Sequence, residues 1–147
     1  MRSFSQSVTI DAPVEAVFGF HAKPDALSLL TPAFPPVRVV RKTGGLEPGS
    51  TVELSVMGMP WIARHGEFIP NRLFSDEQIR GPFAQWVHRH EFESVDGRTR
   101  LTDRVDYRLP GGPLINSLFG WAVEIGLRNM FRHRHAVTRR ECEGSLT

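Results

Sequence analysis

The sequence has few of the features that mark secreted, membrane-spanning or nucleic-acid-binding proteins. Its single cysteine, Cys142, excludes an intrachain disulfide framework and fits a reducing compartment, so we expect a cytoplasmic protein. The longest apolar run, residues 114–127, contains Asn116 and Glu124 and is too short to span a bilayer. Residues 1–10 lack the apolar core of a signal peptide. A net charge of +2 is too small to indicate a nucleic-acid partner.

Phosphate-binding loops are missing as well. The glycine pairs Gly44-Gly45 and Gly111-Gly112 do not join a strand to a helix with the spacing that such a loop requires. We therefore expect no cofactor, no nucleic-acid partner and no stable membrane insertion.

The patterns that are present predict an α+β domain. Alternating polar and apolar residues at positions 3–10 predict a half-buried strand. Pro13 and Pro24 suit the first turns of two short helices, over residues 14–20 and 24–30. Six more strands are expected between turn signals, at residues 37–42, 51–57, 61–68, 73–79, 83–93 and 98–109. Their short spacers make neighbours antiparallel, and the last two are long enough to curl.

After Pro113 the apolar residues recur at helical spacing, which predicts one amphipathic helix of about 27 residues. At about 100° per residue, one side of this helix is mainly apolar and should face the sheet. The residues expected on that side are Ile115, Phe119, Ala122, Gly126, Met130 and His133. Arg128, Arg132 and His135 are expected on the opposite side, which faces water.

Two strands carry polar residues on the face that should be buried. Trp86, His88 and His90 share one face of their strand, and Asp103 and Tyr107 share the more apolar face of the next. We therefore expect His88, His90 and Asp103 to be inward-facing neighbours with at least one histidine–carboxylate hydrogen bond.

This group allows three interpretations. A buried hydrogen-bond network, which positions the strands or contacts the polar end of a ligand without chemistry, is favoured over acid–base catalysis by the His–Asp pair. A metal site is disfavoured, because nothing in the sequence shows that three ligands converge. His65, on another strand, is a further candidate for the group. Asp76 and Gln78 are expected to bond the amides of the nearby Gly81-Pro82 turn, which is favoured over a catalytic role for the Asp76 carboxylate.

The order of elements resembles the helix-grip fold of the START and birch-pollen-allergen-like (SRPBCC) superfamily. Residues 8–18, Val-Thr-Ile-Asp-Ala-Pro-Val-Glu-Ala-Val-Phe, resemble the usual start of its members. Residues 27–32 and 74–90 resemble a bacterial subfamily described as cyclase/dehydrase-like or ligand-binding, and similar domains also occur fused to nucleotide-sugar-epimerase-like proteins. The resemblance implies a single START-like ligand-binding domain over residues 1–147, with a curved seven-stranded antiparallel sheet around the C-terminal helix.

The favoured function is binding or transport of a small hydrophobic ligand, lipid-, polyketide- or aromatic-like, between sheet and helix. The alternative implied by the resemblance is a polyketide cyclase/dehydratase-like enzyme whose catalytic residues are His88, His90 and Asp103. A third class is a protein-interaction module that uses the basic helix face and Trp121. We expect a monomer or weak homodimer. The expected ligand contacts are His65, Phe74, Trp86, His88, His90, Asp103, Tyr107, Phe119, Ala122, Met130 and His133.

Overall fold

A computed structural model describes residues 1–33 and 36–144. Its elements follow in the order β1 (Arg2–Ile10), α1 (Val14–His21), α2 (Ala26–Leu30), β2 (Val37–Thr43), β3 (Thr51–Val56), β4 (Met59–Ile69), β5 (Leu73–Arg80), β6 (Gln85–Val95), β7 (Arg98–Arg108) and α3 (Gly112–Gly144). This is the helix-grip arrangement expected from the sequence, with two short helices after the first strand.

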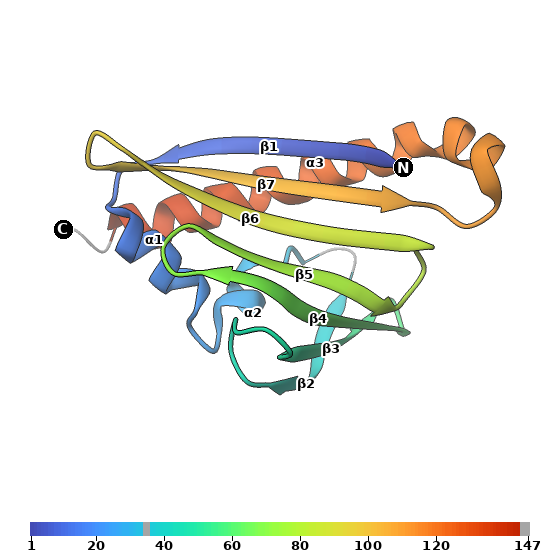
Figure 1. Ribbon diagram of the computed structural model, residues 1–147, viewed down its shortest axis with the longest axis horizontal. Coiled ribbons are helices and arrows are strands. Elements are labelled where there is room, and N and C mark those ends of the chain that lie inside the picture. Colours follow the sequence, from blue (N-terminus) through green and yellow to red (C-terminus); the bar gives the residue numbers. More distant parts are fainter. Residues whose placement is uncertain (34–35, 145–147) are drawn as a thin grey trace.

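The seven strands form one antiparallel sheet in the order β1-β7-β6-β5-β4-β3-β2 (Figure 1). The first strand thus pairs with the last, and every other pair of neighbours is consecutive in the chain. Asp96 and Gly97, both with positive φ, form the tight turn between β6 and β7. A register shift between His65 and Phe68 breaks the alternation of β4, so that Glu67 is exposed although His65 is buried.

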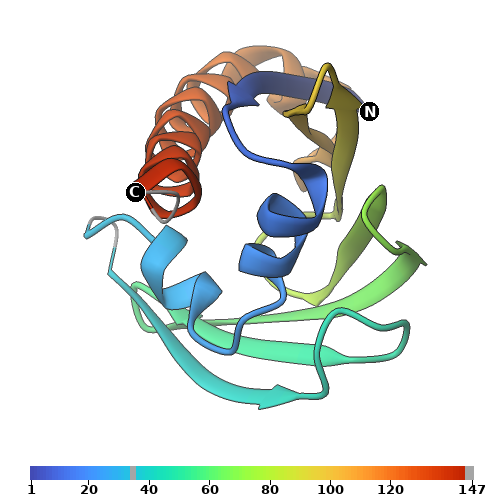
Figure 2. The same ribbon diagram turned by 90° about the vertical axis from the view of Figure 1, so that its left-hand side faces the viewer.

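The sheet curves into an open arc, with α1 and α2 on its concave side and α3 beside the β1 end (Figure 2). The core consists of two apolar clusters. The first joins α1 to the sheet and to the end of α3, through Ile10, Ala12, Val17, Phe18, Phe20, Leu30, Phe74, Phe92, Leu101, Val137 and Cys142. The second joins the middle of α3 to β1, β6 and β7, through Phe4, Trp86, Val105, Tyr107, Leu127 and Phe131.

The buried side of α3 differs from the one predicted. Leu127, Phe131, His135 and Thr138 are buried against the rest of the molecule, and Phe131 is 0% exposed. Gly120 lies so close to β1 that a side chain there would collide with the guanidinium of Arg2.

The residues predicted to face the sheet lie largely elsewhere. Phe119 is 53% exposed, and Ala122, Gly126 and His133 are exposed as well, so their predicted burial was wrong. The prediction failed because the true core face contains polar His135 and Thr138, whereas large apolar residues in the first half of the helix stay exposed. Those exposed residues are Leu114, Leu118, Phe119, Trp121 and Ile125.

The predicted exposure of Arg128 and Arg132 is confirmed. Although α3 is 33 residues long, no helix in the described part of the chain has a stretch long and apolar enough to cross a membrane.

Candidate functional site

The polar residues predicted on the inner faces of β6 and β7 meet in the structure. Asp103 lies opposite His90 in the strand register and accepts a hydrogen bond from Nε2 of His88 through Oδ1, at 2.8 Å. Nδ1 of His90 is 3.0 Å from the same oxygen, although off the line of a hydrogen bond. His88 is 4% exposed, and His90 and Asp103 are each 3% exposed. The predicted buried histidine–carboxylate pair is therefore confirmed.

Two residues from other elements complete this group. His135 on α3 donates through Nε2 to Oδ2 of Asp103 at 2.6 Å. Asp76 on β5 places Oδ2 at 3.4 Å from Nε2 of His90 and 4.0 Å from Nδ1 of His88. We refer to Asp76, His88, His90, Asp103 and His135 as the His–Asp cluster.

Sequence reasoning missed both of these residues. Gln78 bonds the backbone N–H and C=O of Phe83 at the turn as expected, but Asp76 faces the imidazoles instead. Asp76 pairs with His88 in the β5–β6 register, which the sequence alone does not fix. His135 follows the core residue Phe131 by one helical turn, so a correct helix face would have found it.

The His–Asp cluster lies between the two apolar clusters of the core. The ring of His90 stacks on Phe74 with centroids 3.9 Å apart, and the ring of His88 meets Phe131 at 5.1 Å. The two imidazoles lie 3.8 Å from one another. In such apolar surroundings, charges and hydrogen bonds interact more strongly than they do in water.

The carboxylates of the cluster are held ionised. Burial raises the pKa of Asp103, but the hydrogen bonds from His135 and His88 together with the nearby His90 outweigh burial and bring the pKa well below its usual value. Burial likewise raises the pKa of Asp76, and the His90 hydrogen bond together with the charges of nearby histidines lowers it overall. Burial lowers the pKa of His90, yet Asp103 and Asp76 together raise it above its usual value. His90 therefore favours the protonated form between two carboxylates.

The neighbouring histidines favour the neutral form. Burial lowers the pKa of His88, and the charge on His90 adds to this effect, although Asp103 opposes it. Burial also lowers the pKa of His65. His21 on α1 is paired through Nδ1 with the carbonyl of Val17 at 2.8 Å, and burial with the charge on His90 lowers its pKa to about 3.

A neutral and a protonated imidazole side by side can accept and donate a proton, or hydrogen-bond the polar end of a ligand. The arrangement thus suits both acid–base chemistry and polar recognition at the end of an apolar site.

Partly buried apolar side chains pack against the second core cluster. They are Trp61, Phe83, Val123 and Met130, which we call the apolar wall. Trp61 meets Trp86 edge-on at 5.1 Å, and Phe83 lies 4.8 Å from the same ring. The apolar wall thus consists of residues from β4, the β5–β6 turn and α3 that pack against one core cluster.

The remaining predicted ligand residues occupy different environments. Tyr107 is buried, and its hydroxyl donates to the carbonyl of Gly120 at 3.2 Å. His65 is buried near Phe74, with ring centroids 6.1 Å apart. Ala122 and His133 lie on the exposed side of α3 and do not join these groups.

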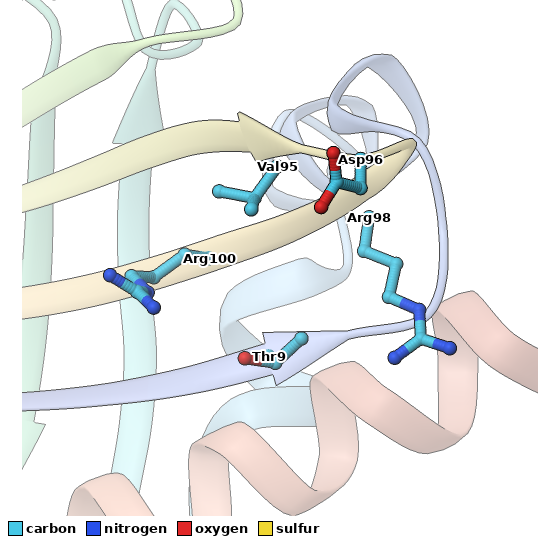
Figure 3. Close-up of a pocket in the computed structure, with 5 residues that line it drawn as sticks. All are labelled: Thr9, Val95, Asp96, Arg98 and Arg100. Carbon is cyan, nitrogen blue, oxygen red and sulfur yellow. The ribbon is translucent and has the colours of Figure 1, made fainter.

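Two hollows lie away from the His–Asp cluster. One, of about 320 Å³, is lined by Thr9, Val95, Asp96, Arg98 and Arg100, around the β6–β7 turn and the end of β1 (Figure 3). The side chain of Arg98 there is 60% exposed and pairs with Asp11 at 3.5 Å, so its charge is solvated. The other, of about 310 Å³, lies between the α2 region and β2, lined by Ser28, Thr31, Pro32, Ala33, Pro36, Val37 and Val39.

The family model described as polyketide cyclase / dehydrase and lipid transport matches residues 10–133. The chain belongs to this family. Within the polyketide cyclase / dehydrase and lipid transport family, both ligand binding and cyclase-type activity fit the fold and the site found here. No curated protein sequence matches the chain.

Three solved structures illustrate the likeness. A nucleoside-diphosphate sugar epimerase from Corynebacterium glutamicum is 28% identical with a TM-score of 0.75, and the match covers 95% of this chain. The present chain spans 29% of that protein's length. The Zhui aromatase/cyclase from Streptomyces sp. R1128 is 16% identical with a TM-score of 0.77, covering 99% of this chain and 96% of that one. A START superfamily protein from Mycobacterium smegmatis is 14% identical with a TM-score of 0.65, covering 99% of each chain. These structures show that the chain shares their fold.

Proposed function

We propose that this protein binds one small apolar or aromatic molecule between α3 and the concave face of the sheet. The apolar wall carries the proposal, because its four residues remain only partly buried although all of them pack against the same core cluster. Phe119 precedes Val123 by one helical turn and is 53% exposed, so it extends the same surface. Covering apolar surface yields about 25 cal/mol per Å², which makes this surface a source of affinity.

The polar end of the ligand would be recognised by the His–Asp cluster. His88 contacts Phe131 of the core cluster on which the apolar wall packs, so the polar and apolar parts of the proposed site adjoin. A few placed polar groups at the end of an apolar site are typical of small-molecule pockets. The single cysteine supports a cytoplasmic location, and we propose a monomer or weak homodimer.

A thermal-shift screen against fatty acids, polyketides, flavonoids and isoprenoids tests this proposal. A ligand that binds the native form should raise the melting temperature in a concentration-dependent way. Val123→Trp should fill the site and abolish the shift, whereas Ala122→Trp, one residue along on the exposed side, should retain it. No shift with any of these compounds, or equal loss in both variants, would contradict binding at the apolar wall.

A cyclase-type reaction is the second candidate, favoured by the neutral His88 beside the protonated His90 and by the likeness to an aromatase/cyclase. A binding protein should tolerate His88→Asn with a modest loss of affinity. An enzyme that relies on this imidazole should lose roughly 10²- to 10⁴-fold in rate on a polyketide substrate, with substrate binding largely kept.

A further inference from the structure

We propose that Asp76, His88 and His90 form a binding site for one divalent transition-metal ion such as Zn²⁺. From the sequence alone, no third ligand could be assigned to the pair His88 and His90. The pairing of β5 with β6 places Asp76 beside them. One donor atom from each of the three residues lies within 4.8 Å of the other two.

The donor distances fit a metal ion. Four ligands at the usual zinc bond lengths of about 2.0–2.1 Å stand roughly 3.3 Å from one another. Oδ2 of Asp76 is 3.4 Å from Nε2 of His90 and 4.0 Å from Nδ1 of His88. The three donor atoms, now within 4.8 Å of one another, would therefore each have to move by about 1 Å or less to bind one ion. Two imidazoles and one carboxylate are a common ligand set for zinc and for iron(II).

Asp103 is placed to orient the two imidazoles, because it faces the ring nitrogen of each that would not bind the metal ion. It faces Nε2 of His88 at 2.8 Å and Nδ1 of His90 at 3.0 Å, which are the ring nitrogens turned away from Asp76. With a proton on each of these nitrogens, the lone pairs of the opposite nitrogens face Asp76. His135 fixes Asp103 in turn, through a 2.6 Å hydrogen bond. Metal-bound histidines usually have a carboxylate in this position.

The two carboxylates also suit a cation. Asp76 lies beside both His90 and His88, and Asp103 lies on the other side of the two imidazoles, so a divalent ion held by the site would be attracted by both acidic groups. Three protein ligands leave at least one coordination position for water or for a donor group of a bound molecule.

Isothermal titration of chelator-treated protein with Zn²⁺ tests the site. We expect one equivalent to bind the wild type, a higher melting temperature with zinc, and a Co²⁺ absorption spectrum that shows nitrogen and oxygen ligands in a low-coordinate site. Glu77→Gln, the neighbouring residue on the exposed face of β5, should leave the affinity unchanged. Asp76→Asn should weaken binding by at least about 100-fold, and Asp103→Asn by roughly 10- to 100-fold with a changed Co²⁺ spectrum.

Circular dichroism of the metal-free variants checks that each one folds, and His88→Gln replaces Asp76→Asn if that variant does not. Absence of stoichiometric zinc binding in the wild type would overturn the proposal. So would binding that these variants leave unchanged, since it would come from surface groups such as His133.

Discussion

Phe131 provides a sharp test of how α3 packs on the sheet. Its ring is 0% exposed, stacks on Phe4 at 5.8 Å and meets His88 at 5.1 Å. The guanidinium of Arg134 lies 5.6 Å from the ring centroid. Phe131→Ala therefore removes a side chain that touches β1, β6 and its own helix at once.

Truncating a buried phenylalanine costs about 3–5 kcal/mol, since apolar contacts are lost and a cavity remains. We expect the upper half of that range, because neighbours on three elements would have to move to fill the gap. For a domain of about 150 residues this corresponds to a fall in melting temperature of roughly 6–20 °C. The loss is a large part of a typical total stability of about 5–15 kcal/mol.

Urea unfolding followed by circular dichroism measures this loss, and Phe119→Ala is the matched control. Phe119 is the same residue type on the same helix but is 53% exposed, so its truncation should cost less than about 1 kcal/mol. If Phe119→Ala proved as costly as Phe131→Ala, α3 would pack through the side predicted from its apolar pattern, and the face described here would be wrong.

Two more predictions concern buried titratable groups. The pKa of His21 is lowered to about 3 in the folded state, so the unfolded chain takes up its proton first as the pH falls below about 6.5. Between pH 7 and pH 5 the wild type should therefore lose about 2 kcal/mol more stability than His21→Gln does in urea unfolding, and equal losses would contradict this. Burial raises the pKa of Cys142 to about 11, so its thiol should react slowly with iodoacetamide at pH 8 in native protein and rapidly in urea. Equal rates in both conditions would show that this thiol is accessible.

The sequence was sufficient to predict the fold and the centre of the site. Strand alternation placed His88, His90 and Asp103 on inner faces, because a period of two fixes the face of each residue once a strand is recognised. The turn signals separated β2 to β7 at nearly the observed bounds, with β6 beginning at Gln85 rather than at residue 83.

The remaining errors come from polar residues that are buried with partners. His135 was assigned to water because its helical angle groups it with Arg128 and Arg132, yet Asp103 satisfies it inside the core. The position of Asp76 beside the imidazoles likewise depends on the register of β5 against β6, which neither strand determines by itself. The order of apolar and polar residues along the chain does not reveal either of these two contacts.

The pairing of the first strand with the last affects how the chain can fold while the ribosome is still making it. β1 leaves the exit tunnel early, but its partner β7 follows only after the stretch between Ile10 and Arg98 has been made, roughly 4–18 s later at usual elongation rates. During that delay β1 has no neighbour for its backbone N–H and C=O groups. The serines at positions 3, 5 and 7 make one face of the unpaired β1 hydrophilic. Because α3 follows β7 in the chain, the sheet can close around its helix only after α3 has also been made, and a pause during the synthesis of α3 would delay this closure.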